Sequence, residues 1–113
     1  MGSRASMAGL ICRGEIRWYK FSKPDKKRPV LVLTRATHIE YLKTVTVAPI
    51  TSAIREVPSQ VQLSIEDGLQ NDCVVNLDHL RTVEKSHLGS LIATLSNDRL
   101  VEIKIAILYA LGF

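Results

Sequence analysis

The first 95 residues either alternate apolar and polar side chains or carry short apolar runs, a pattern typical of β-strands. Residues 14–21 and 61–65 alternate, which indicates strands with one face toward solvent. Residues 29–34 form a continuous apolar run, as expected of a strand buried on both faces. The pattern predicts five or six short strands, over residues 14–21, 29–34, 44–50, 61–65, 73–82 and 90–95.

A different spacing follows at the C-terminal end. Ser96 suits a helix N-cap and Gly112 suits a helix end. Between them, apolar residues recur at intervals of three and four: Leu100, Ile103, Ile107 and Leu111. Residues 36–43 are a helical turn or a loop, and residues 84–88 one helical turn. Because strands and helices do not alternate, we predict a mainly β fold with a C-terminal α-helix, a small SH3-like antiparallel half-barrel.

Composition agrees with one globular domain, since 46% of the 113 residues are hydrophobic and 23% are charged. Residues 1–6, which precede a second methionine at Met7, are interpreted as an expression scar, so the domain is expected to span 7–113. No apolar run approaches the ~20 residues that cross a bilayer. We therefore expect no membrane association and a cytoplasmic protein in which Cys12 and Cys73 are reduced thiols.

Neither a metal nor a cofactor is expected. The two cysteines lie far apart, and the three histidines (His38, His79 and His87) add no metal-ligand spacing. Motifs that bind nucleotides or build a hydrolase nucleophile are also absent from the sequence.

Positive charge is concentrated in one segment. The formal net charge is +4, and residues 13–28 carry seven Lys and Arg against only Glu15 and Asp25. A one-sided cationic segment is the electrostatic footprint of a polyanion partner such as nucleic acid. The alternative is a solvated basic edge that protects a strand from aggregation.

Two strand ends carry candidate chemistry. Arg28 immediately precedes the strand that Pro29 opens, and Thr51 follows the strand of residues 44–50. If these strands are neighbours, a guanidinium and a hydroxyl meet at one rim and can grip a phosphate. RNA cleavage without metal needs such groups, because the 2′-OH attacks the adjacent phosphorus and negative charge develops on the phosphorane. Arg28 is expected to supply charge, and Thr51 to orient a phosphate oxygen.

Each of these residues also has a purely structural interpretation. Arg28 could pair with a carboxylate, and Thr51 with Ser52 could form a plain strand-ending turn. His79, on the predicted strand 73–82, could face the core. Trp18, Tyr19 and Phe21 could stack on bases, although the spacing of Trp18 with Ile16 favours a core position for the tryptophan.

Four short motifs, in order along the chain, resemble those of the MazF/PemK-type mRNA interferase toxins. They are residues 13–18 (RGEIRW), 27–33 (KRPVLVL), 48–52 (APITS) and 77–83 (LDHLRTV). The resemblance runs from about Arg13 to Phe113. It implies a CcdB-like fold and a sequence-specific, ribosome-independent endoribonuclease of a toxin–antitoxin module.

The resemblance also implies site residues and partners. Arg28 and Thr51 occupy the positions of the family's catalytic arginine and threonine. We predict that the RNA-binding residues are Lys20, Lys26, Lys27, Ser52, Asp78, His79 and Arg81. The expected partners are single-stranded mRNA, a second copy of the chain in a homodimer, and a MazE-like antitoxin with an acidic, disordered tail. Two departures stand out: the first loop, Ser22 to Lys27, is short, and His79 replaces the usual Gln or Asn.

Two other functions fit the same fold. A gyrase poison of the CcdB type relies on a tryptophan near the C-terminus, whereas this chain ends in Leu111-Gly112-Phe113 and its only tryptophan is Trp18. A module that binds RNA or antitoxin without cleaving RNA is the third alternative, because a fold does not determine a function.

Overall fold

A computed structural model describes residues 10–21 and 26–113 of the chain. The predicted expression scar at residues 1–6 and most of the short first loop, residues 22–25, lie outside the described residues. Within the described part, no helix is both long and apolar enough to span a bilayer.

Seven strands and one α-helix make up the described residues, together with four short 3₁₀ turns. The strands are β1 (Glu15–Lys20), β2 (Lys27–Val32), β3 (Thr44–Thr51), β4 (Gln60–Leu63), β5 (Cys73–Asn76), β6 (Arg81–Glu84) and β7 (Leu88–Thr94). The 3₁₀ turns are η1 (Ile39–Tyr41), η2 (Ile65–Asp67), η3 (Leu77–His79) and η4 (Lys85–His87), and the helix is α2 (Asn97–Leu111).

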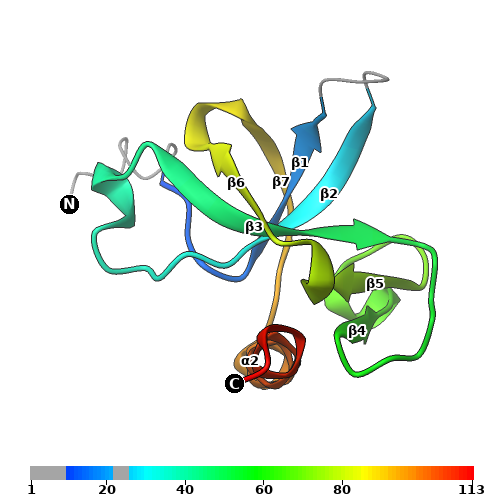
Figure 1. The fold of residues 1–113 in the computed structure, drawn as a ribbon. Coiled ribbons are helices and arrows are strands. Elements are labelled where there is room, and N and C mark those ends of the chain that lie inside the picture. The colour runs from blue at the N-terminus through cyan, green and yellow to red at the C-terminus, as the bar shows by residue number, and fades with distance from the viewer. Residues whose placement is uncertain (1–9, 22–25) are drawn as a thin grey trace.

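Strand β3 is the centre of a strongly bent, open antiparallel sheet (Figure 1). One edge of β3 pairs with β2, and the sheet continues through β1 to β7. The other edge is shared, because residues 44–47 pair with β6 and residues 50–51 pair with β5. The turn η3 connects β5 to β6 at this change of partner. The adjoining position on β3 is Pro49, which has no N–H to donate.

Two hydrophobic clusters pack on the two faces of the sheet. The larger one lies between the sheet and α2 and includes Leu31, Leu77 and Ile103. The smaller one covers the other face and includes Val30 and Val32. Neighbouring residues of β2 thus enter different clusters, which confirms the prediction that this strand is buried on both faces.

Helix α2 begins and ends as predicted. The Ser96 hydroxyl accepts a hydrogen bond from the Arg99 N–H, and Gly112 adopts a left-handed conformation with φ of 82°. Arg99 also ties the helix to η2 through two hydrogen bonds to the Asp67 carboxylate, of 2.9 and 3.1 Å. These contacts hold α2 against the end of the sheet that carries β4 and β5 (Figure 1).

Several predictions about elements were wrong. Residues 73–82 are two strands separated by η3, so the sheet has seven strands where five or six were predicted. His79 is consequently an exposed residue of a 3₁₀ turn, so it does not face the core. Trp18 is 37% exposed, so it is not a core residue. Leu111 is exposed as well. The predicted helical turn over residues 84–88 is confirmed as η4, and β7 begins directly after it.

Candidate active site

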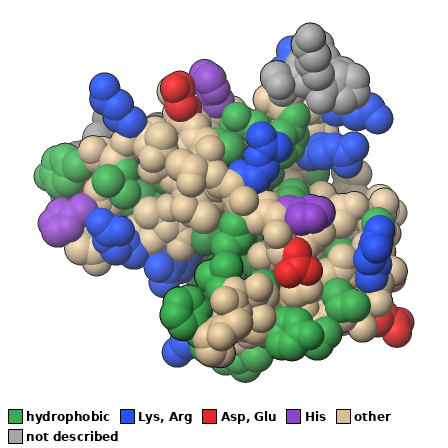
Figure 2. Space-filling view, viewed as in Figure 1, with side chains coloured by type: hydrophobic (Ala, Val, Ile, Leu, Met, Phe, Trp, Pro, Cys, Tyr) green, Lys and Arg blue, Asp and Glu red, His purple; other side chains and the backbone are tan. Residues whose placement is uncertain are grey.

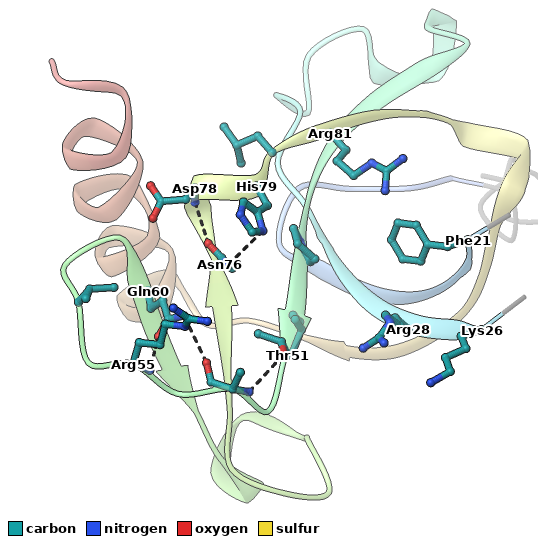
Figure 3. A pocket seen from close by; sticks show the side chains of 15 residues that line it. Phe21, Lys26, Arg28, Thr51, Arg55, Gln60, Asn76, Asp78, His79 and Arg81 are labelled. Atoms are coloured by element: carbon teal, nitrogen blue, oxygen red, sulfur yellow. Dashed lines mark hydrogen bonds between the residues drawn. The ribbon is translucent and has the colours of Figure 1, made fainter. Parts of the chain in front are cut away.

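A cleft of about 900 Å³ opens where β2, β3, η3 and the β3–β4 loop meet (Figure 3). The cleft has apolar lining residues, which include Pro49, Ile50 and Leu80 and are called its floor below. Polar and aromatic side chains stand around this floor: Phe21, Lys26, Arg28, Thr51, Arg55, Gln60, Asn76, Asp78, His79 and Arg81. Segments far apart in the sequence thus build one concave surface.

The cleft is cationic. Lys26, Arg28, Arg55 and Arg81 line it, whereas Asp78 is the one carboxylate among the described lining residues. On the face seen in Figure 2, Lys and Arg side chains gather near the tips of β1 and β2. Positive charge around a concave surface attracts polyanions and raises their local concentration. The arrangement therefore suits a nucleic acid or an acidic polypeptide.

Arg28 lies inside β2, because this strand begins at Lys27 and not at Pro29 as predicted. Its side chain is exposed, and it is directly opposite Tyr19 of β1. Its neighbour Pro29 belongs to the same strand and pairs with Trp18. The guanidinium reaches the cleft from the β2 side, beside Lys26 (Figure 3). An exposed guanidinium keeps its donors available for a phosphate, which it can bind in a bidentate manner.

Thr51 is the last residue of β3 and lies across the cleft from Arg28 (Figure 3). Its hydroxyl oxygen accepts a hydrogen bond of 3.2 Å from the Ala53 N–H. Because that oxygen already accepts, the hydroxyl hydrogen is left to donate to a ligand. Arg28 and Thr51 line this cleft together, as expected from the strand ends, and both also line an adjoining cleft of about 460 Å³.

The η3 turn builds the opposite wall through a chain of hydrogen bonds. The nearly buried Ser59 hydroxyl donates to Asp78 Oδ2 over 2.5 Å. The backbone N–H of Asp78 donates to Asn76 Oδ1 over 2.9 Å, and Asn76 Nδ2 lies 3.3 Å from His79 Nδ1. Asn76 therefore caps the turn and also contacts the imidazole that faces the cleft.

The β3–β4 loop contributes Arg55, which the sequence analysis did not single out. Gln60 holds this loop, since its side-chain oxygen accepts from the Arg55 N–H (2.8 Å) and its amide nitrogen donates to the Ala53 carbonyl (3.4 Å). Glu56 lies at the tip with a positive φ of 55°, which is uncommon for a residue other than glycine. No sequence motif marked Arg55, Gln60 or Asn76, because their positions depend on this loop and on η3.

Phe21 forms an aromatic wall. The Arg81 guanidinium lies 4.9 Å from the centre of its ring, and the Tyr19 ring meets it edge-on at 4.8 Å. A cation over an aromatic face is attracted to it, so Arg81 is held in place beside the cleft. Phe21, one of the candidate base-stacking residues, lines the cleft.

The predicted site residues separate into three groups. Those that line the main cleft are Lys26, Arg28, Thr51, Asp78, His79 and Arg81. Lys27 and Ser52 line the adjoining cleft instead. Lys20 is paired with Lys27 across β1 and β2 and is not among the residues that line either cleft.

No group of three or more His, Cys, Asp or Glu side chains in the described ranges, 10–21 and 26–113, is placed to hold a metal ion. Both cysteines are free thiols; Cys12 is exposed, and Cys73 lies inside, where burial raises the pKa of its thiol.

Together the bent sheet, the C-terminal helix and the cationic cleft define a small β-rich protein with a positively charged concave surface. The chain belongs to the family of PemK-like, MazF-like toxins of type II toxin–antitoxin systems, whose model matches residues 12–111.

Three similar proteins illustrate the relationship. The chain is 42% identical over 65 residues to endoribonuclease MazF3 of Mycobacterium tuberculosis, a match that spans 58% of this chain and 63% of the relative. It is 33% identical to the solved toxin MazF-mt6 of the same species, with a TM-score of 0.80 over 88% of this chain and 97% of the other. A chain in the solved MazE–MazF structure of Deinococcus radiodurans is 26% identical to this chain, with a TM-score of 0.78 over 92% of this chain and 98% of the other.

Proposed function

We propose that this protein is a toxin that cleaves single-stranded mRNA at specific sequences without a metal ion. The observation that carries the proposal is the position of Arg28 and Thr51 at the rim of a cationic cleft. The name of the similar endoribonuclease MazF3 supports an endoribonuclease, and the similar MazF-mt6 is named a toxin. Because its substrate is mRNA, we place its activity in the cytoplasm.

In the proposed reaction, the ribose 2′ oxygen forms a bond to the adjacent phosphorus and the bond from phosphorus to the 5′ oxygen breaks. The 2′-OH loses its proton, and the departing 5′ oxygen gains one. The products are a 2′,3′-cyclic phosphate and a 5′-OH end. Negative charge grows on the phosphorane oxygens, where Arg28 provides an opposing charge and the Thr51 hydroxyl a hydrogen bond.

The other cleft residues are proposed to bind the RNA strand. Lys26 and Arg81 contact phosphates, and Lys20, Lys27 and Ser52 extend the path beyond the main cleft. Asp78 and His79 face the bases. Single-stranded RNA exposes its bases to aromatic rings and hydrogen-bonding groups, and this cleft offers both.

The toxin is proposed to be neutralised by a MazE-like antitoxin. The same four cations would bind an acidic, initially disordered tail, and the apolar floor would accept its hydrophobic side chains. The tail would thus exclude RNA from the cleft. The solved MazE–MazF pair of Deinococcus radiodurans supports a partner of this kind.

The deciding experiment incubates the purified protein with a long single-stranded RNA, with and without EDTA, and analyses the ends of the fragments. We expect cleavage at a defined sequence, unchanged by EDTA, that yields cyclic phosphate and 5′-OH ends. Products with a 5′-phosphate, or activity lost in chelator, would contradict the chemistry. Intact RNA together with inhibited gyrase would favour the alternative of a gyrase poison.

A further inference from the structure

Asn76 has a fixed orientation because its two amide atoms have different partners. The backbone N–H of Asp78 can only donate, so the Asn76 atom that it meets at 2.9 Å is the oxygen. The amide nitrogen must then be the atom that lies 3.3 Å from His79 Nδ1. Asn76 caps η3 through the same oxygen, so reversing the amide would break the cap.

This orientation determines what His79 can offer to a ligand. An amide nitrogen carries only donors, so Nδ1 of His79 must accept. In the neutral ring the proton then resides on Nε2. In this arrangement His79 presents one N–H donor.

We propose that Asn76 is a positioning residue that fixes His79 as a hydrogen-bond donor, and that this donor reads an acceptor atom on one RNA base. The inference rests on the proposed function, because it assigns a specificity determinant to the same cleft. The acceptor belongs to the oxygen and ring-nitrogen atoms on base edges, which differ from base to base.

The position of His79 favours a base over a phosphate. Lys26 and Arg28 approach the cleft from the β2 side, whereas His79 and Asn76 lie on the other side of β3 (Figure 3). His79 is drawn beside Asn76 and away from Arg28, so it lies apart from the guanidinium that is proposed to hold the reacting phosphate (Figure 3). A base rotated out of the RNA strand can lie on the apolar floor of the cleft and expose its edge to His79.

The first test is spectroscopic and needs no RNA. Imidazole ¹⁵N shifts of the full chain at pH 8.5 distinguish a ring protonated on Nε2 from one protonated on Nδ1. We expect the proton on Nε2 in the wild type. In Asn76→Asp a carboxylate still caps the turn but can only accept, so the proton should move to Nδ1. A wild-type proton on Nδ1, or no change in Asn76→Asp, would overturn the proposal.

The second test maps cut sites. The wild type, Asn76→Asp, His79→Gln and the double variant are each incubated with a randomised RNA pool at pH 8.5, and the cut ends are sequenced. We expect Asn76→Asp to change discrimination at one base position by about tenfold, the size expected for a lost base contact. His79→Gln should alter the same position, and adding Asn76→Asp to it should change nothing further. Asn97→Asp, which adds the same charge outside the cleft, is the matched control.

The two tests separate the inference from the function beneath it. An equal loss of cleavage on all RNA sequences would indicate a phosphate contact or a structural role, and it would overturn the proposal that His79 reads a base. Changes at different positions for Asn76→Asp and His79→Gln would do the same. If the wild type cuts no RNA, the proposed function fails, while the ¹⁵N shifts still decide whether Asn76 fixes the ring.

Discussion

At the scale of single residues, Arg28 and Thr51 reach one cleft from two neighbouring strands. Arg28 and Thr51 each follow from a short motif attached to a strand, and the pairing of β2 with β3 brings those ends to one cleft. Arg55 and Asn76 could not be found in this way. Their side chains reach the cleft because the backbone turns at Glu56 and at η3, and turns of this kind leave little trace in an apolar pattern.

Arg28→Ala is expected to lower the cleavage rate by about 10²-fold or more while leaving the fold intact, because it removes a positioned charge from the transition state. Arg28 is exposed, so the loss should not create a buried cavity. Single-turnover cleavage together with thermal melting measures both effects. Arg35→Ala, which removes an exposed arginine that lines neither cleft, is the matched control. Turnover near that of the wild type in Arg28→Ala would refute the central role of this residue.

Thr51 offers a graded series. Thr51→Ser keeps the hydroxyl, which accepts from the Ala53 N–H and can still donate, so we expect a mild effect. Thr51→Ala and Thr51→Val both remove the hydroxyl, and Val keeps the branched shape that suits the end of β3. Both should lose about 10-fold or more in rate, the scale of one lost hydrogen bond to a charged group. If Thr51→Val cleaves as fast as Thr51→Ser, the hydroxyl has no part in the reaction.

At the scale of elements, the apolar periodicity predicted a segment correctly where a single spacing holds along its whole length. Helix α2 has a serine cap, a regular apolar spacing and a terminal glycine, and all three appear in the structure. The prediction of one continuous strand over residues 73–82 was wrong because two effects compete within these ten residues. Their alternation favours a continuous strand, but the Asn76 side chain caps the Asp78 N–H and starts a 3₁₀ turn. That local hydrogen bond divides the strand and brings His79 to the cleft.

The link between α2 and η2 predicts a pH-dependent stability. Hydrogen bonds from Arg99 lower the pKa of the Asp67 carboxyl in the folded protein. The unfolded chain, with an ordinary value of about 3.9, therefore binds more protons in acid. The carboxylate stabilises the fold fully above that value, and the contribution is lost as the pH falls through the lowered folded pKa.

Asp67→Asn should consequently reduce the free energy of unfolding at pH 7 by about 1–3 kcal/mol, the scale of hydrogen bonds to a charged group. The difference from the wild type should shrink as the pH falls from about 5 to below 3.9. Urea unfolding of both proteins at a series of pH values measures this difference in the free energy of unfolding. Glu66→Gln removes a charge from the exposed neighbouring residue and should be nearly neutral. A difference that stays constant down to pH 2 would show that the carboxylate charge is not the cause.

At the scale of the whole molecule, the surface divides into regions of different chemistry. The cationic cleft lies where β2, β3 and η3 meet, whereas α2 carries exposed apolar side chains along one side: Val101, Ile105, Leu108 and Tyr109. Their spacing of three and four residues places them on one face of the helix. An apolar stripe of this kind on a surface helix is typical of a protein–protein interface. We therefore expect the cleft to bind RNA and antitoxin, as proposed, and the stripe to form the interface of the predicted homodimer.

Ile105→Glu should convert the homodimer to a monomer, because it buries a charge in the centre of that stripe, where Ile105 is 62% exposed in the single chain. Tyr41→Glu is the matched control, since Tyr41 is 75% exposed on η1, which precedes β3 at the end of that strand away from β5. Light scattering at micromolar concentration should give the mass of a dimer for the wild type and the control, and that of a monomer for Ile105→Glu. A wild type that is monomeric under these conditions would refute the dimer. An Ile105→Glu variant that remains dimeric would move the interface to another surface, and the exposed Trp18 and Leu91 beside the adjoining cleft would then be the next residues to substitute.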